Sequence, residues 1–117
     1  MSAFGGFVRE TREALRAVDP SFSVRQVAGR IGVQPSYLSK VKRGDVGPPS
    51  ENTIVRLAED LGEDPDVMLA LAGKVSSDLL EVIKKRPRLF ADLIRELKDM
   101  PDRAVLKLVR EVRDGEW

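Results

Sequence analysis

The chain has 117 residues, of which 42% are hydrophobic and 33% charged, a net charge of +1, and neither cysteine nor histidine. This composition is not that of a disordered chain, and the missing residue types exclude disulfides, zinc fingers, cysteine nucleophiles and every catalytic scheme that needs an imidazole. No apolar run approaches the roughly 20 residues of a membrane span and no secretory signal opens the chain, so we expect a cytoplasmic, non-enzymatic protein without metal or other cofactors.

Apolar residues recur at three- and four-residue spacing from end to end, and alternating strand patterns are nearly absent, so the sequence predicts an all-α protein. The first helix is expected from Phe7 to about Val18, because Pro20 cannot continue it. We expect its inward side chains to be those of Val8, Leu15 and Val18.

Two short helices should follow in close succession. Ser23 is a good N-cap for the second helix, and Gly32 ends that helix in the left-handed conformation that glycine tolerates. The third helix opens with Pro35 near its first position and ends at Gly44. The apolar residues expected to face inward from this pair are Val27, Ala28, Ile31, Leu38 and Val41.

Two more helices should complete the first part of the chain. Ser50 caps a fourth helix that Gly62 ends, and a short fifth helix follows Asp64 and Pro65. The apolar residues of these two helices are Ile54, Leu57, Ala58, Leu61, Met68, Leu69 and Leu71.

Residues 72–74, Ala-Gly-Lys, are the best candidate for a domain boundary. The length suits one small domain with a helical appendage, so we expect residues 1–73 to form the domain and residues 74–117 a C-terminal helical extension. Three helices are expected in the extension, from Ser76 or Ser77 to the residue before Pro87, from Pro87 to Lys98, and from Pro101 to Arg113.

The segment SVRQVAGRIGVQPSYLSKVKRG, residues 23–44, resembles the helix-turn-helix of the Cro and phage-repressor superfamily of regulators. The family pattern requires a small residue at the position of Ala28, because the two steeply crossing helices approach so closely there that a large side chain would push them apart. Alanine meets this requirement. The likeness continues through residues 48–73 and covers about residues 7–73. It implies a five-helix DNA-binding domain.

The resemblance also implies which residues meet DNA. The third helix would lie in the major groove, where a glutamine suits adenine and a lysine suits guanine. The residues implied for base contacts are Gln34, Pro35, Ser36 and Lys40. Those expected to contact the DNA backbone are Arg25, Tyr37, Ser39, Lys42 and Arg43. Tyr37 fits two roles, since its ring either packs on the domain with its hydroxyl toward a phosphate or reaches a base.

The charge distribution bears on the same surface. Residues 1–49 carry eight Lys or Arg against four Asp or Glu, whereas residues 50–73 carry one against six and residues 74–117 eleven against nine. Within residues 23–44 there are five basic residues and no acidic one. A phosphate-binding surface has this pattern, although an ordinary solvated face produces the same count.

Two positions depart from the family pattern. Val24 stands where many relatives carry a glutamine that binds phosphate, so Arg25 would have to supply that contact. Lys42 replaces an acidic residue that often pairs with an arginine of the first helix. The loop over residues 19–23 is also longer than usual, which leaves the alignment of the first helix open.

The C-terminal extension resembles the helical tails with which some regulators of this family dimerise. Its last two helices carry wide apolar stripes, made of Leu89, Phe90, Leu93, Ile94 and Leu97 in one and Val105, Leu108, Val109 and Val112 in the other. A two-helix hairpin cannot bury faces this wide by itself, so we expect it to form a homodimer interface. The alternative is that the hairpin folds back on its own DNA-binding domain.

The leading hypothesis is therefore a transcriptional regulator, a repressor in particular, that binds double-stranded DNA at a palindromic operator as a homodimer. The alternative is an interaction module or antitoxin whose tail binds a partner protein. The exposed face expected for the third helix favours DNA binding, because an interaction module has no need for Gln34, Ser36 and Lys40 beside flanking cations.

Overall fold

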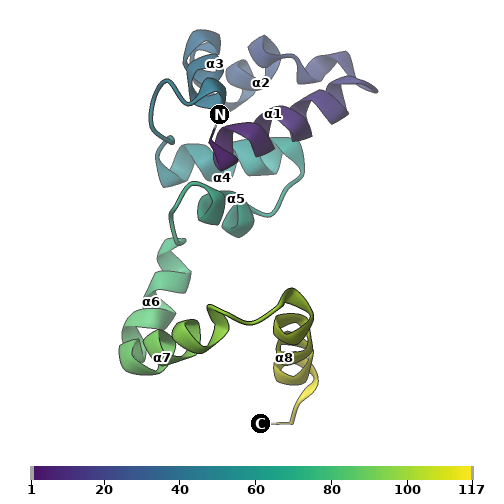
Figure 1. Ribbon diagram of the computed structural model, residues 1–117. Coiled ribbons are helices and arrows are strands. Elements are labelled where there is room, and N and C mark those ends of the chain that lie inside the picture. The colour runs from purple at the N-terminus through teal and green to yellow at the C-terminus, as the bar shows by residue number, and fades with distance from the viewer. Residues whose placement is uncertain (1, 117) are drawn as a thin grey trace. The chain divides into compact units, whose positions relative to one another are not determined.

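The helices of the computed structural model, which describes residues 2–116, confirm the predicted all-α class, and no strand is found in that range (Figure 1). The first five helices, with one short 3-10 helix, are α1 (Ala3–Arg16), η1 (Pro20–Phe22), α2 (Val24–Ile31), α3 (Pro35–Arg43), α4 (Glu51–Leu61) and α5 (Pro65–Leu71). They are followed by α6 (Ser77–Lys85), α7 (Pro87–Leu97) and α8 (Asp102–Asp114). The chain divides into two compact units, one ending at Ser76 and the other starting at Ser77.

The helix ends follow the local chemistry of the sequence. Ser23 and Ser50 cap α2 and α4, because their hydroxyl oxygens accept hydrogen bonds from the backbone N–H groups of Gln26 (3.2 Å) and Thr53 (3.4 Å). Three helices end at a glycine in the left-handed region, with φ between 72° and 79°. These glycines are Gly32, Gly44 and Gly62, as predicted.

The first helix differs from the prediction at both ends. It begins at Ala3, because the Ser2 hydroxyl accepts from the N–H of Gly5 at 3.0 Å and the first turn buries Phe4. It ends at Arg16, and Val18 lies beyond it with 85% of its surface exposed. The prediction that Val18 faces the core was therefore wrong, since the chain leaves the helix before that side chain could turn inward.

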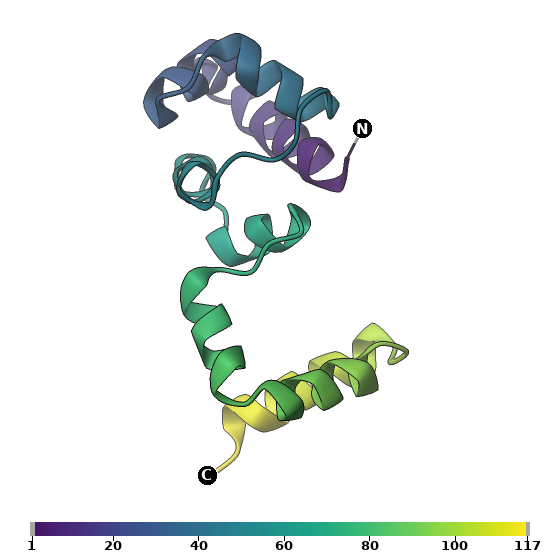
Figure 2. The same cartoon turned by 90° about the vertical axis from the view of Figure 1, so that its left-hand side faces the viewer.

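The core of the first unit joins all five helices. In both views α4 and α5 lie on one side of the group formed by α1, α2 and α3, and α1 contacts both of them (Figures 1 and 2). Leu15 and Tyr37 pack partly buried against this core. Its fully buried hydrophobic residues, which include those predicted from α2, α3 and α4, are Phe4, Val8, Val27, Ala28, Ile31, Leu38, Val41, Ile54, Leu57, Ala58, Leu61, Met68 and Leu69.

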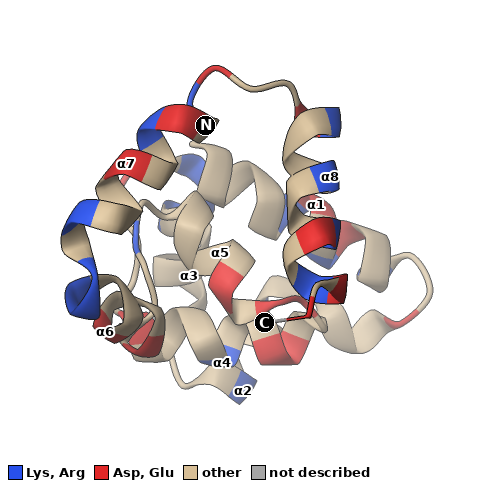
Figure 3. Ribbon diagram, turned by 90° about the horizontal axis from the view of Figure 1, so that it is seen from below, with Lys and Arg blue, Asp and Glu red and all other residues tan. Residues whose placement is uncertain are grey.

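The second unit has no such core. No side chain between residues 77 and 116 is buried, although its three helices are strongly amphipathic. Basic and acidic residues are interspersed along α7 and α8 (Figure 3). None of the described helices is long and apolar enough to cross a membrane.

Candidate nucleic-acid interface

The turn between α2 and α3 holds the two helices in one geometry. Gly32 adopts φ 79°, and the N–H of Val33 donates to the carbonyl oxygen of Ala28 at 3.0 Å. Ala28 is fully buried and Val33 packs on the core from the turn. A short turn closed by these contacts leaves little freedom between the helices, which is what a helix-turn-helix requires.

The outer face of α3 brings together the residues predicted to contact bases. Gln34, Ser36 and Lys40 are exposed, and Pro35 is half-buried at the first position of the helix. Gln34 is the N-cap residue, yet its side chain makes no capping hydrogen bond within the described chain. Its amide therefore stays available to a ligand, and Ser36 and Lys40 stand one turn apart on the same face.

The residues predicted to contact the DNA backbone differ in exposure and in their partners. Arg25 is exposed near the N-terminus of α2, and Ser39 is half-buried on α3. The ring of Tyr37 packs against the core. Arg43 is exposed, and its Nε donates to the Asp45 carboxylate at 2.9 Å.

Lys42 is less exposed than Arg25 and Arg43, the other cations predicted to contact the DNA backbone. Its side chain is half-buried at the end of α3, and burial lowers the pKa of the Lys42 ammonium below its ordinary value of 10.5. The cations of Arg12, Arg9 and Arg43 lower this pKa further, and the Glu13 carboxylate offsets part of the effect. In the free protein, therefore, Lys42 is surrounded by more positive than negative side chains.

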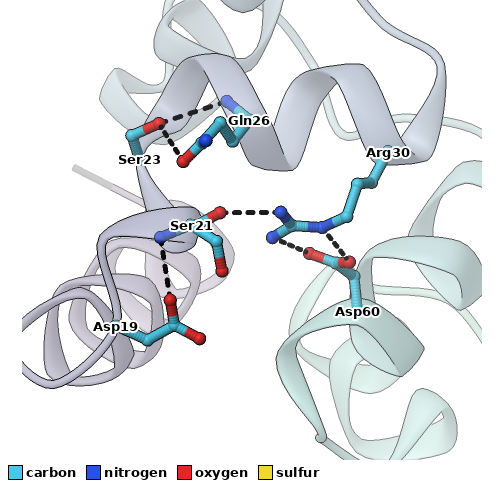
Figure 4. A network of polar contacts seen from close by, with 6 residues as sticks. All are labelled: Asp19, Ser21, Ser23, Gln26, Arg30 and Asp60. Atoms are coloured by element: carbon cyan, nitrogen blue, oxygen red, sulfur yellow. Dashed lines mark hydrogen bonds and ion pairs between the residues drawn. The ribbon is translucent and has the colours of Figure 1, made fainter.

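Arg30 is a basic residue of the motif that serves the fold (Figure 4). Its Nε and Nη2 donate to the two carboxylate oxygens of Asp60 on α4 at 2.6 and 3.0 Å, and its Nη1 donates to the backbone oxygen of Ser21 at 2.7 Å. The guanidinium also lies 5.0 Å from the centre of the Phe22 ring. The pattern of five basic residues therefore overstated the charge open to DNA, because Arg30 is already neutralised by Asp60.

Sequence reasoning missed the part of α1 that borders α3. A groove of about 330 Å³ between the two helices is lined by Arg9 and Glu13 of α1 and by Ser39, Lys42 and Arg43 of α3. The replacement of an acidic residue by Lys42 was the one available signal, since it removes the partner of an arginine on the first helix.

The second unit brings part of the predicted dimer stripes together. An apolar groove of about 380 Å³ lies between α7 and α8. Leu89 and Ile94 lie outside the groove on the exposed surface of α7, and Phe90 is half-buried. The groove is lined by Leu93, Leu97, Val105, Leu108, Val109, Val112 and Arg113.

Comparison with known families agrees with this geometry. A family model described as a helix-turn-helix domain matches residues 3–71, which is more than half of the chain and spans α1 to α5. Neither the curated proteins nor the solved structures contain a significant match to the chain. Helix-turn-helix domains bind DNA through the second helix of the motif, which is α3 here.

Proposed function

The chain belongs to this helix-turn-helix domain family, and we propose that it is a sequence-specific transcriptional repressor that binds a palindromic operator as a homodimer. The observation that carries the proposal is the outer face of α3, where Gln34, Ser36 and Lys40 are exposed together. A face built only for packing on a protein would expose apolar side chains instead.

In this proposal α3 enters the major groove. Gln34 pairs with adenine, Lys40 with guanine, Ser36 with either, and Pro35 touches a thymine methyl group. Arg25, Ser39, Lys42 and Arg43 contact backbone phosphates, which position the domain without reading the sequence. Tyr37 directs its hydroxyl toward a phosphate, a role supported by the packing of its ring on the core.

The homodimer is proposed to form through the second unit. Its support is that residues 77–116 bury no side chain while α7 and α8 line an apolar groove, so the unit needs a further surface to cover it. We propose that the surface covering this groove is the second unit of another copy of the chain. Residues 77–117 carry ten basic and nine acidic side chains, so two such units would associate without net electrostatic repulsion. Two α3 helices could then enter successive major grooves roughly 34 Å apart.

Selection of bound sequences from a random duplex pool tests the function. The expected result is one enriched palindromic site, whose symmetry reports specific binding and two-fold assembly together. Failure to enrich any sequence at low salt would contradict the regulator function and favour the alternative, in which the second unit binds a partner protein.

Two variants separate base contacts from phosphate contacts at the selected site. Lys40→Ala should cost about 1 to 3 kcal/mol on that site and relax the preference at one base position. Arg43→Ala should weaken binding to every duplex alike and reduce the dependence of affinity on salt. Equal behaviour of the two variants would mean that Lys40 reads no base.

A further inference from the structure

The groove between α1 and α3 lies beside a close contact of the two helices, which meet at Gly5 without a side chain between them. A Cβ added at Gly5 of α1 would overlap the backbone oxygen of Lys42 at the end of α3. This close approach brings the next turns of α1 beside α3, where Arg9 and Glu13 face Ser39 and Lys42 across the groove.

A buried arginine stands beside this groove. Arg12 is 3% exposed, its Nη1 donates to the backbone oxygen of Phe22 at 3.1 Å, and its Nη2 lies 3.7 Å from the Glu13 carboxylate. Within the described residues its Nε has no hydrogen-bond partner. A buried cation with an unmet donor is costly unless negative charge comes close.

The carboxylates near the groove do not balance its cations. Glu13 is shared between Arg12 and the Nε of Arg9, which lies 3.2 Å from the same Glu13 oxygen, while Arg43 pairs with Asp45. Arg9, Arg12, Lys42 and Arg43 thus stand against the two carboxylates of Glu13 and Asp45. Burial lowers the pKa of Lys42, and the cations of Arg12, Arg9 and Arg43 lower it further. A negatively charged ligand bound in the groove would offset this excess of positive charge.

We propose that the groove between α1 and α3 binds a phosphate group, held by Arg9, Ser39, Lys42 and Arg43. The four side chains supply one hydroxyl, one ammonium and two guanidinium groups, which are the donors that phosphate oxygens accept best. Resting on the proposed function, we assign the phosphate to the DNA backbone, because the groove borders the α3 face that carries Ser36 and Lys40. The new element is Arg9, which makes α1 part of the DNA-binding surface.

A titration of the full-length protein with sodium phosphate, against sodium chloride of equal ionic strength, tests the phosphate site without DNA. In nitrogen-15 NMR spectra we expect the guanidinium signals of Arg9 and Arg43 and the amides of Ser39 and Lys42 to shift with saturation. The shifts should disappear in Arg9→Gln and persist in Arg16→Gln, a matched control on the same helix that does not line the groove. Equal shifts at all surface cations, Arg16 included, would overturn the site.

Binding to duplex DNA then identifies the source of the phosphate. Arg9→Gln should lose roughly three- to ten-fold in affinity on specific and unrelated duplexes alike and lower the salt slope by about one, because one phosphate contact is lost. Arg16→Gln should bind as the wild type does. Saturable phosphate shifts with unchanged DNA binding of Arg9→Gln would support the site but reject the DNA backbone as the source.

The two proposals can fail separately. If the wild type binds no duplex, the proposed function fails, while the phosphate titration still decides the site. If the wild type binds DNA, Arg9→Gln matches Arg16→Gln, and phosphate causes no saturable shift, the function stands and the phosphate site is rejected. Thermal unfolding of both variants, followed by circular dichroism, shows whether a missing phosphate or DNA signal arises because the variant has unfolded.

Discussion

Arg30 and Asp60 join α2 to α4 through two parallel hydrogen bonds of 2.6 and 3.0 Å. The same guanidinium holds the backbone oxygen of Ser21, so one side chain ties the helix-turn-helix to α4 and to the loop before α2. Pairing of this two-point kind is stronger and more directional than a single surface ion pair. The residue thus contributes to the position of α2 rather than to DNA binding.

Replacement of Arg30 by Ala is expected to lower the free energy of unfolding by about 1 to 2 kcal/mol, because three hydrogen bonds and the contact with Phe22 are lost. Urea unfolding measures the change. Arg25→Ala is the matched control on the same helix and should change stability by less than about 0.5 kcal/mol. Equal effects of the two substitutions would show that the Arg30 contacts contribute nothing in solution.

Gly5→Ala is expected to destabilise the first unit by about 1 to 3 kcal/mol, since the added Cβ would overlap the Lys42 carbonyl oxygen and force α1 away from α3. The control is Gly29→Ala on α2, where a Cβ meets nothing within 4 Å. That variant should gain about 0.5 to 1 kcal/mol, because alanine is the better helix former. Thermal or urea unfolding compares them, and a stabilised Gly5→Ala would refute the close contact between the helices.

Lys42→Met is expected to raise the stability of the free protein slightly, on the order of 0.5 kcal/mol at neutral pH, while weakening its binding to DNA. The pKa of Lys42 is lower in the folded protein than its ordinary value of 10.5, so folding disfavours the charged form. The cost is fully present below the folded pKa and is lost as the pH rises from that value toward 10.5. The stability gain of Lys42→Met should therefore shrink in alkaline solution.

Urea unfolding of the wild type and of Lys42→Met between pH 7 and about pH 10 measures this difference. Subtraction of the two curves cancels the titration of every other group that the substitution leaves unchanged. A gap that widens with pH would mean that Lys42 gains a favourable partner on folding, contrary to the local surplus of positive charge.

Val109→Asp is expected to abolish dimerisation, because Val109 lines the apolar groove between α7 and α8 and a carboxylate there could not be desolvated. Leu106→Asp, on the same helix but outside the groove, is the matched control and should stay dimeric. A fragment ending at Ser76 should behave as Val109→Asp does, and both should bind a full operator far more weakly through the loss of effective concentration.

Sedimentation equilibrium measures the association state of the wild type, the two variants and the fragment. Far-ultraviolet circular dichroism verifies that the first unit stays folded in each. A fragment ending at Ser76 that associates as tightly as the full chain would reject the second unit as the interface. A wild type that is monomeric at every concentration would instead favour a different partner protein for the groove.

The sequence by itself determined the features that depend on neighbouring residues. Ser23 and Ser50 begin helices because a hydroxyl can satisfy a backbone N–H two or three positions on, and Gly32 ends one because glycine accepts a positive φ. The inward stripes of α2, α3 and α4 followed from helical spacing, which fixes which side chains share a face. The residues proposed for base contact came instead from the family resemblance of residues 23–44, and their contacts stay a prediction.

Only the tertiary structure decided what depends on which helices meet. The Ser2 cap was a local signal for the early start of α1 that the sequence prediction missed. Nothing local to residues 3–6 shows that the start of α1 packs on α3, so the need for Gly5 could not be predicted. Arg30 looked like one more cation until α4 brought Asp60 to it, 30 residues away. The burial of Arg12 is of the same kind, because contacts between distant segments are set by packing of the whole unit, whereas caps and spacing are set within one or two turns.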